Sequence, residues 1–140
     1  MYVLDTDHIV ELHLGTRLGE LVRQRIAECD DEVVTTIISA EEAMRGWLAE
    51  IHRARNSPRQ ISAYRRLGQL FDDFAAMSVL PFDDEAARVL DELRLAKLRV
   101  GVLDLRIAAI TLANGAKLAS SNGRDFEQVP GLIVEDWLGR

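Results

Sequence analysis

The chain has 140 residues, of which 48% are hydrophobic and 29% charged, and a net charge of −6. This length predicts one domain over residues 1–140, large enough to bury a full core without disulfides or structural metal. No apolar run approaches the roughly 20 residues of a membrane span, the N-terminus does not resemble an export signal, and Cys29 is the sole cysteine. We therefore expect a cytoplasmic protein without a membrane partner.

The first 55 residues alternate between strand and helix. Residues 33–38 are β-branched throughout, which is typical of a parallel strand covered on both faces. Ser39 and Glu42 match an S-x-x-E capping box, which predicts that a helix starts at Ser39. The predicted elements are a strand over 2–5, helices over 6–13 and 17–29, a strand over 33–38 and a helix over 39–55.

The predicted helix over 39–55 forms a helical hairpin with the helix that follows it. The rest of the chain begins with this second helix and ends with two strands. Pro58 starts the second helix, and Asp83 is expected to cap the helix after it. The predicted elements are a helix over 58–76, a strand over 79–82, helices over 83–101 and 104–113, a strand over 117–120, a turn or short helix over 122–127 and a strand over 132–134. This order predicts a three-layer α/β/α sandwich with a mostly parallel central sheet of about five strands.

Four acidic residues occur where a predicted strand ends or a predicted helix begins. They are Asp5, Glu42, Asp104 and Asp125. Because the carboxyl ends of parallel strands meet at one edge of a sheet, we expect these side chains to converge. Each acid alone also fits a helix-capping role, so their joint placement is what indicates a site for a hard divalent cation.

Asp104 fits a purely structural role least well. It lies at the start of a helix that is otherwise almost wholly apolar and is therefore expected to be buried. A buried carboxylate is costly unless a cation, a proton or several hydrogen bonds compensate for its charge. A Mg²⁺ or Mn²⁺ ion would provide that compensation.

Four motifs surround these acids. They are Leu4-Asp5-Thr6-Asp7-His8, residues 36–42 followed by Arg45-Gly46-Trp47, residues 101–109 around Asp104, and residues 121–126 around Asp125. In these motifs and their spacing the sequence resembles PIN-domain ribonucleases, and more narrowly VapC toxins of bacterial type II toxin–antitoxin pairs. The resemblance spans essentially the whole chain.

This resemblance implies a metal-dependent endoribonuclease. It implies that the catalytic residues, which are also the ligands of Mg²⁺ or Mn²⁺, are Asp5, Glu42, Asp104 and Asp125. The implied reaction is hydrolysis of an RNA phosphodiester by a metal-activated water, which leaves 5′-phosphate and 3′-hydroxyl ends. Glu42 would either bind the metal or accept the proton of the water.

Further residues near the acids have weaker assignments. Asn122 takes the polar position of the family beside the metal, and Asp7 adds a carboxylate where many relatives have asparagine. Arg45, one turn after Glu42, is a candidate for contact with an RNA phosphate. His8 has no histidine partner for acid–base catalysis, so we expect a solvated or capping role for it.

Three other readings of the sequence stay open. Asp5 and Asp7 also match the start of haloacid-dehalogenase-like phosphatases, although only Lys97 and Lys117 are available for the lysine of that family. A non-enzymatic metal-binding α/β module would have a similar acidic site. A PIN domain that cuts nucleic acids other than the RNA targets of toxins is the third.

The expected partners follow mainly from the resemblance. It implies an RNA substrate, a homodimer and a cognate antitoxin, whose amphipathic segment would lie along the helices that follow the first two strands. Trp47, Leu48 and Phe71 either line such a surface or pack in the core, and core packing is the favoured reading.

The distribution of charge both opposes and supports a nucleic-acid ligand. The acidic net charge argues against binding by bulk electrostatics. Positive charge is nevertheless concentrated between Arg45 and Arg66, and arginine suits bidentate phosphate contacts. A solvated arginine-rich helix face is the alternative explanation.

Overall fold

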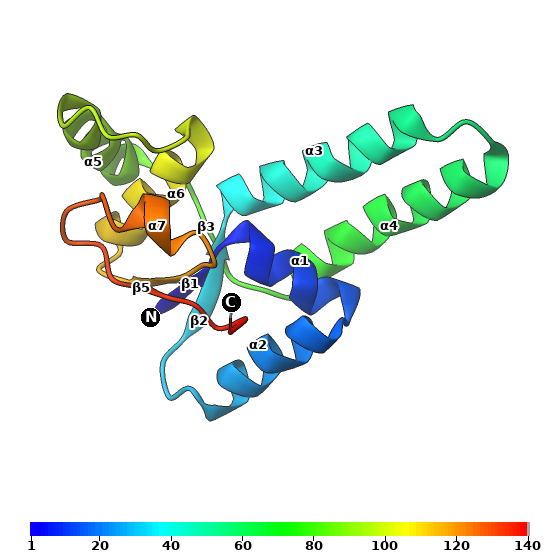
Figure 1. Cartoon of the computed structure of the whole chain (residues 1–140), viewed down its shortest axis with the longest axis horizontal. Helices are drawn as coiled ribbons and strands as arrows, with labels where there is room; N and C mark the ends of the chain where they lie inside the picture. Colours follow the sequence, from blue (N-terminus) through cyan, green and yellow to red (C-terminus); the bar gives the residue numbers. More distant parts are fainter. Residues whose placement is uncertain (140) are drawn as a thin grey trace.

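The computed structural model describes residues 1–139 and has a parallel sheet between layers of helices (Figure 1). The strands are β1 (Tyr2–Leu4), β2 (Val33–Thr36), β3 (Val79–Leu80), β4 (Lys117–Ala119) and β5 (Val134–Glu135). They lie in the order β3-β2-β1-β4-β5, and each neighbouring pair is parallel. The predicted α/β/α sandwich with about five mostly parallel strands is confirmed.

Helices connect the strands throughout the described chain. They are α1 (Thr6–Leu14), α2 (Arg17–Glu28), α3 (Ile37–Arg53), α4 (Ser57–Ala75), α5 (Asp84–Leu95), α6 (Val102–Ala113) and α7 (Gly123–Phe126). Asp83 caps α5 as predicted, because its side chain accepts a hydrogen bond from the Ala86 amide at 3.0 Å. That helix ends at Leu95, before the predicted position near residue 101, and Lys97 just beyond it has a positive φ of 50°. Within residues 1–139, no helix is long and apolar enough to cross a membrane.

The start of α3 differs from the prediction. Thr36 rather than Ser39 is the N-cap, and its hydroxyl accepts a hydrogen bond from the Ser39 amide at 3.1 Å. The predicted capping box is therefore wrong. Thr36 lies three residues before Ser39, and a threonine hydroxyl is also a good helix cap. The strand accordingly stops at Thr36, and Glu42 has no role in capping the helix.

Two hydrophobic layers cover the two faces of the sheet. Because successive residues of a strand point to opposite faces, Val3 and Leu118 pack with residues of α5 and α6. Leu4 and Ala119 pack on the other face with residues of α1 and α2 and with Trp137 near the C-terminus. The ends of β1 and β4 are therefore fixed from both sides.

The α3–α4 hairpin extends away from this body (Figure 1). Its two helices meet through small and buried residues, such as Ala63 and Leu70 of α4. Leu48 and Phe71 are 41% and 60% exposed, so the favoured reading that they pack in the core is wrong for these two residues. Trp47 is half-buried. Within the described residues no further element covers the outer side of the hairpin, which explains the exposure.

Candidate metal centre

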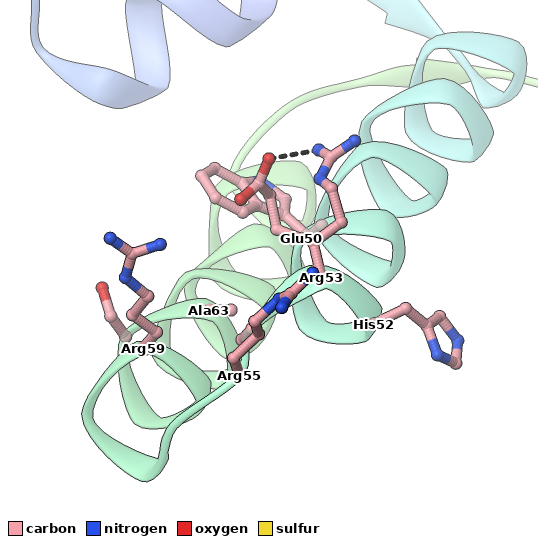
Figure 2. A pocket seen from close by; sticks show the side chains of 9 residues that line it. Glu50, His52, Arg53, Arg55, Arg59 and Ala63 are labelled. Carbon is pink, nitrogen blue, oxygen red and sulfur yellow. Dashed lines mark hydrogen bonds and ion pairs between the residues drawn. The ribbon is translucent and has the colours of Figure 1, made fainter.

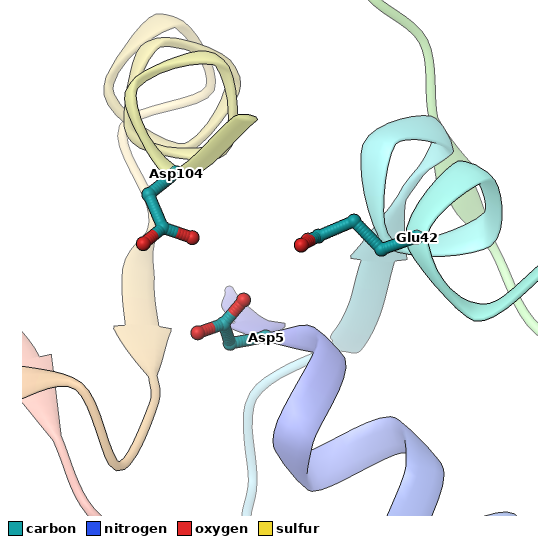
Figure 3. Close-up of side chains that lie close together, drawn as sticks. All are labelled: Asp5, Glu42 and Asp104. Carbon is teal, nitrogen blue, oxygen red and sulfur yellow. The ribbon is translucent and has the colours of Figure 1, made fainter. Parts of the chain in front are cut away.

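Three of the four predicted acids come together at the carboxyl edge of the sheet. Asp5 directly follows β1, Glu42 lies in the second turn of α3, and Asp104 lies in the first turn of α6. One carboxylate oxygen from each lies within 4.8 Å of the other two, and Figure 3 shows the side chains pointing toward one another. The site is beside β1 and β4, where the order of strands along the chain reverses, which is the usual place for ligands in open α/β folds.

Asp5 is the most constrained of the three acids. Its side chain is 5% exposed. One carboxylate oxygen accepts a hydrogen bond from the Thr6 amide at 2.8 Å, and the other accepts one from the Ser120 hydroxyl at 2.6 Å. Asp5 is therefore the N-cap of α1 and a member of the acidic cluster at the same time.

Thr6 orients Glu42. Its hydroxyl donates a hydrogen bond to one carboxylate oxygen of Glu42 at 2.7 Å and lies 3.1 Å from the hydroxyl of Ser39. The second carboxylate oxygen of Glu42 has no hydrogen-bond partner within residues 1–139. Glu42 is thus held by one oxygen and can present the other to the cluster.

Asn122 joins Asp104 to Asp125. Its amide nitrogen donates one hydrogen bond to Asp104 at 3.0 Å and one to Asp125 at 3.2 Å. Asn122 is the N-cap residue of α7, but its side chain makes no capping hydrogen bond there and is free to bind the two acids. Asp125 lies outside the group of three carboxylates. It is linked to Asp104 of that group by the two hydrogen bonds of the Asn122 amide.

The pKa values of the three clustered acids are all raised above their ordinary values. Burial raises the pKa of Asp5 to about 7, and the charges of Asp7 and Asp104 add to this, against hydrogen bonds from Ser120 and Thr6. Burial also raises the pKa of Asp104, with the charges of Asp125 and Asp7 acting in the same direction.

Glu42 behaves similarly, because burial and the charge of Asp104 raise its pKa against the hydrogen bond from Thr6 and the charge of Arg45. Three carboxylates with raised pKa values at one place form a cluster that a cation would stabilise.

The donor set fits a hard divalent cation. All three groups offer carboxylate oxygen, which Mg²⁺ and Mn²⁺ prefer over nitrogen and sulfur. Within residues 1–139, none of the three forms an ion pair with a basic side chain. Arg45, the predicted phosphate contact, instead pairs with Glu41 at 2.6 Å and is 67% exposed. Glu42 rather than Glu41 is therefore the acid available to the cluster.

The lysines do not support the phosphatase reading. Lys117 lies at the start of β4, opposite Tyr2, and its ammonium is 5.4 Å from the centre of the Tyr2 ring. Asp5 lies beyond the other end of these strands. Lys97 lies in the turn after α5, and neither lysine pairs with Asp5 within the described residues.

His8 has a structural role that the sequence did not reveal. It is completely buried, its Nδ1 lies 2.7 Å from an oxygen of Asp7, and its Nε2 accepts a hydrogen bond from the Trp137 amide at 3.0 Å. The expectation of a solvated or capping histidine is wrong. Its partner lies 129 positions away in the sequence, so no local pattern could have indicated the contact.

Asp7 connects this histidine to the loop after β4. Its second oxygen accepts a hydrogen bond from the Ser121 amide at 2.9 Å. Burial acts to raise the pKa of Asp7, but the hydrogen bond and charge of His8 and the bond from Ser121 outweigh it, so the pKa lies below its ordinary value. Asp7 is thus an ionised residue beside the cluster that positions the segment carrying Asn122.

Comparisons with known proteins agree with this geometry. The PIN domain family matches residues 2–132. The tRNA(fMet)-specific endonuclease VapC of Salmonella typhimurium is 29% identical in an alignment of length 83 that covers 56% of this chain and 63% of that protein. The match thus covers less than two thirds of the length of this relative.

Solved structures share the fold. The VapBC2 complex of Rickettsia felis bound to a promoter DNA fragment contains a chain with a TM-score of 0.75 and 21% identity, over 97% of this chain and 98% of that chain. VapBC-5 of Mycobacterium tuberculosis matches with a TM-score of 0.60 and 27% identity, over 96% of this chain and 94% of that chain. Together with the family match over residues 2–132, the parallel sheet and its acidic edge lead to one conclusion: the chain belongs to the PIN-domain family.

Proposed function

We propose that this protein is a Mg²⁺- or Mn²⁺-dependent endoribonuclease and the toxin of a type II toxin–antitoxin pair. The observation that carries the proposal is the group of three carboxylates within 4.8 Å of one another, contributed by three separate elements. Such a group is costly to assemble without a cation. Membership in the PIN-domain family and similarity to a VapC endonuclease support the same activity.

Asp5, Glu42 and Asp104 would hold the ion. A bound divalent ion lowers the pKa of water and stabilises charge on the leaving oxygen of a phosphodiester. The oxygen of Glu42 that Thr6 leaves free would either bind the ion or accept the proton of the attacking water. Water rather than the ribose 2′-hydroxyl attacks, so the products carry 5′-phosphate and 3′-hydroxyl ends.

Asn122 and Asp125 complete the site from one side. The Asn122 amide donates a hydrogen bond to each of Asp104 and Asp125 and so fixes the positions of the two carboxylates. Asp125 binds the ion directly or through water. A cation among these acids reverses the local charge, which lets an acidic protein accept a phosphate backbone.

RNA with an exposed single strand is the proposed substrate class. Bases in loops can be splayed out, and their backbone is accessible to a site at a sheet edge. The similarity to a protein named for cleavage of an initiator tRNA makes tRNA the first class to test. The cytoplasm, where such substrates occur, is the expected compartment.

The proposed partners are an antitoxin and a second copy of this chain. Similar folds occur in complexes named VapBC, which supports an antitoxin here. A narrow apolar groove between α1, α3 and α4, lined by residues such as Leu14, Trp47 and Leu70, fits an amphipathic segment. The uncovered side of α4, with Ile61, Tyr64 and Phe71 each more than half exposed, fits a homodimer surface.

Cleavage of total cellular RNA by the purified protein tests the activity. We expect cleavage with Mg²⁺ or Mn²⁺, none in EDTA, and a loss of at least about a hundredfold for Asp104→Asn. That substitution keeps an acceptor for Asn122 and removes a charge from the cluster, so the melting temperature in EDTA should stay equal or rise. Cleavage that persists in EDTA or in the variant would contradict the proposal.

A further inference from the structure

The tip of the α3–α4 hairpin contains a second pocket, far along α3 from the acidic cluster. It has a volume of about 750 Å³ and lies between the end of α3 and the start of α4. Its lining includes Trp47, Arg53, Arg55 and Arg59, and Figure 2 shows Arg55 and Arg59 near the turn between the helices and Arg53 directed toward Glu50. We call this the hairpin-tip pocket.

The positive charge of this pocket is mostly uncompensated. Residues 51–71 contain five arginines and no acidic residue, in a chain whose net charge is −6. Arg53 forms an ion pair with Glu50, the one acid in the lining. Arg55 and Arg59 are exposed, and within residues 1–139 neither guanidinium has an acidic partner. Two free guanidinium groups in one pocket are suited to bind phosphate oxygens in a bidentate manner.

Helix stability does not explain the position of Arg59. It lies in the first turn of α4, which contains no acidic residue, and its backbone amide is already capped by Asn56 at 3.0 Å. The N-terminal end of a helix carries a partial positive charge, so an arginine there is electrostatically unfavourable. An anion bound in the pocket would interact favourably with both the helix end and the arginine.

A continuous face of α3 joins the pocket to the acidic cluster. Residues 42, 46, 49 and 53 follow the spacing of one helix face, so Glu42 and Arg53 lie on the same side of α3. Between them are Gly46, where an added Cβ would meet nothing within 4 Å, and Ala49. The separation of 11 residues corresponds to about 16 Å, or on the order of five nucleotides of a stacked strand.

We propose that the hairpin-tip pocket binds backbone phosphates of a single-stranded RNA segment whose scissile bond lies at the acidic cluster. This inference rests on the proposed nuclease function. Trp47 adds an aromatic surface to the pocket, and sites for single-stranded nucleic acid combine positive charge with aromatic side chains on which bases stack. The face of α3 over the exposed Gly46 and the partly buried Ala49 provides a path for the strand between the two places.

RNA binding in EDTA tests the pocket without cleavage. The probe is a fluorescent, unstructured RNA of about 20 nucleotides, and the variant is Arg55→Gln with Arg59→Gln. We expect binding about tenfold weaker than that of the wild type, and a slope of log affinity against log salt that is smaller by about 1.4, or 0.7 for each lost phosphate contact.

Arg23→Gln with Arg94→Gln is the matched control, because it removes two exposed arginines from α2 and α5. We expect it to change the affinity less than about twofold. Equal losses in the two double variants, or no loss in either, would overturn the proposal. So would a hairpin variant that keeps its RNA affinity but no longer binds polyglutamate, because the occupant would then be an acidic protein segment.

Steady-state cleavage separates this inference from the proposed function. For the long RNA, the hairpin variant should raise KM about tenfold and leave kcat unchanged. For an RNA of about four nucleotides, too short to span 16 Å, the variant and the wild type should have equal KM. If the wild type cuts neither RNA although the binding results hold, the nuclease proposal fails and the phosphate pocket stands. If the wild type cuts the long RNA and the variant has the same KM, the pocket assignment fails.

Discussion

The first and last turns of α3 belong to two regions with opposite character. At the sheet edge, Asp5 and His8 are buried, and both are held by hydrogen bonds that reach distant parts of the chain. On the hairpin, Phe71 and Arg55 are exposed, and within the described residues no hydrogen bond or ion pair holds the Arg55 side chain. Groups that must keep a fixed geometry thus lie where two layers of the fold constrain them. Groups that can contact a large partner lie on an element with one side uncovered.

Replacing a phenylalanine by alanine should change the free energy of unfolding by very different amounts in the two regions, and this is the largest difference we expect. Phe126, next to Asp125, is completely buried, whereas Phe71 on the hairpin is 60% exposed. Phe126→Ala should lower the free energy of unfolding by about 3 to 5 kcal/mol, and Phe71→Ala by less than about 0.5 kcal/mol. Urea unfolding of both variants measures this. Similar losses would mean that the hairpin is packed against another part of the protein or another copy.

The raised pKa values of the acids at the sheet edge should make the stability of the protein depend on pH. In the folded protein the pKa of Asp5 is about 7, above its ordinary value of 3.8, so the folded state holds a proton that the unfolded chain releases. The free energy of unfolding in EDTA should therefore fall by roughly 3 kcal/mol between pH 5 and pH 8. Glu42 and Asp104, whose pKa values are also raised, act in the same direction.

Asp5→Asn is the control for this dependence. It removes the titrating group, so urea unfolding at the two pH values should give a clearly smaller difference than in the wild type. A wild-type protein that becomes more stable from pH 5 to pH 8 would show that Asp5 is ionised in the folded state without a metal.

Replacing a histidine by alanine should give a smaller difference in unfolding free energy between the sheet edge and the hairpin. His8→Ala removes a buried ring and leaves the Trp137 amide without its acceptor, which should cost about 2 to 3 kcal/mol of unfolding free energy. His52, at the exposed end of α3, should tolerate alanine within about 0.5 kcal/mol. Thermal denaturation of the two variants compares them directly. A tolerant His8 would mean that the C-terminal segment docks without it.

The sheet edge could be predicted from the sequence because its signals are local. Apolar strands followed by acids, and the parallel order of strands, predicted that Asp5, Glu42, Asp104 and Asp125 converge, and the structure groups the first three. The start of α3 was predicted wrongly, because Thr36 and Ser39 are both good caps and only the structure shows which one is used.

The other differences between the prediction and the structure come from contacts between residues that are distant in the sequence. His8 and Trp137 are 129 positions apart, and their hydrogen bond follows from the fold of the whole chain. The apolar side of α4 has the spacing of a core-facing helix, and the sequence cannot show that the fold places no layer over it.

Binding of Mn²⁺ measured by calorimetry tests the central claim most directly. The wild type should bind Mn²⁺ at pH 7.5, and Asp104→Asn should bind at least about tenfold more weakly. Glu41→Gln is the matched control, because Glu41 neighbours Glu42 in sequence but pairs with Arg45 outside the cluster, and its affinity should equal that of the wild type. If Asp104→Asn binds Mn²⁺ as tightly as the wild type, or if the wild type binds none, the three carboxylates do not form the metal site.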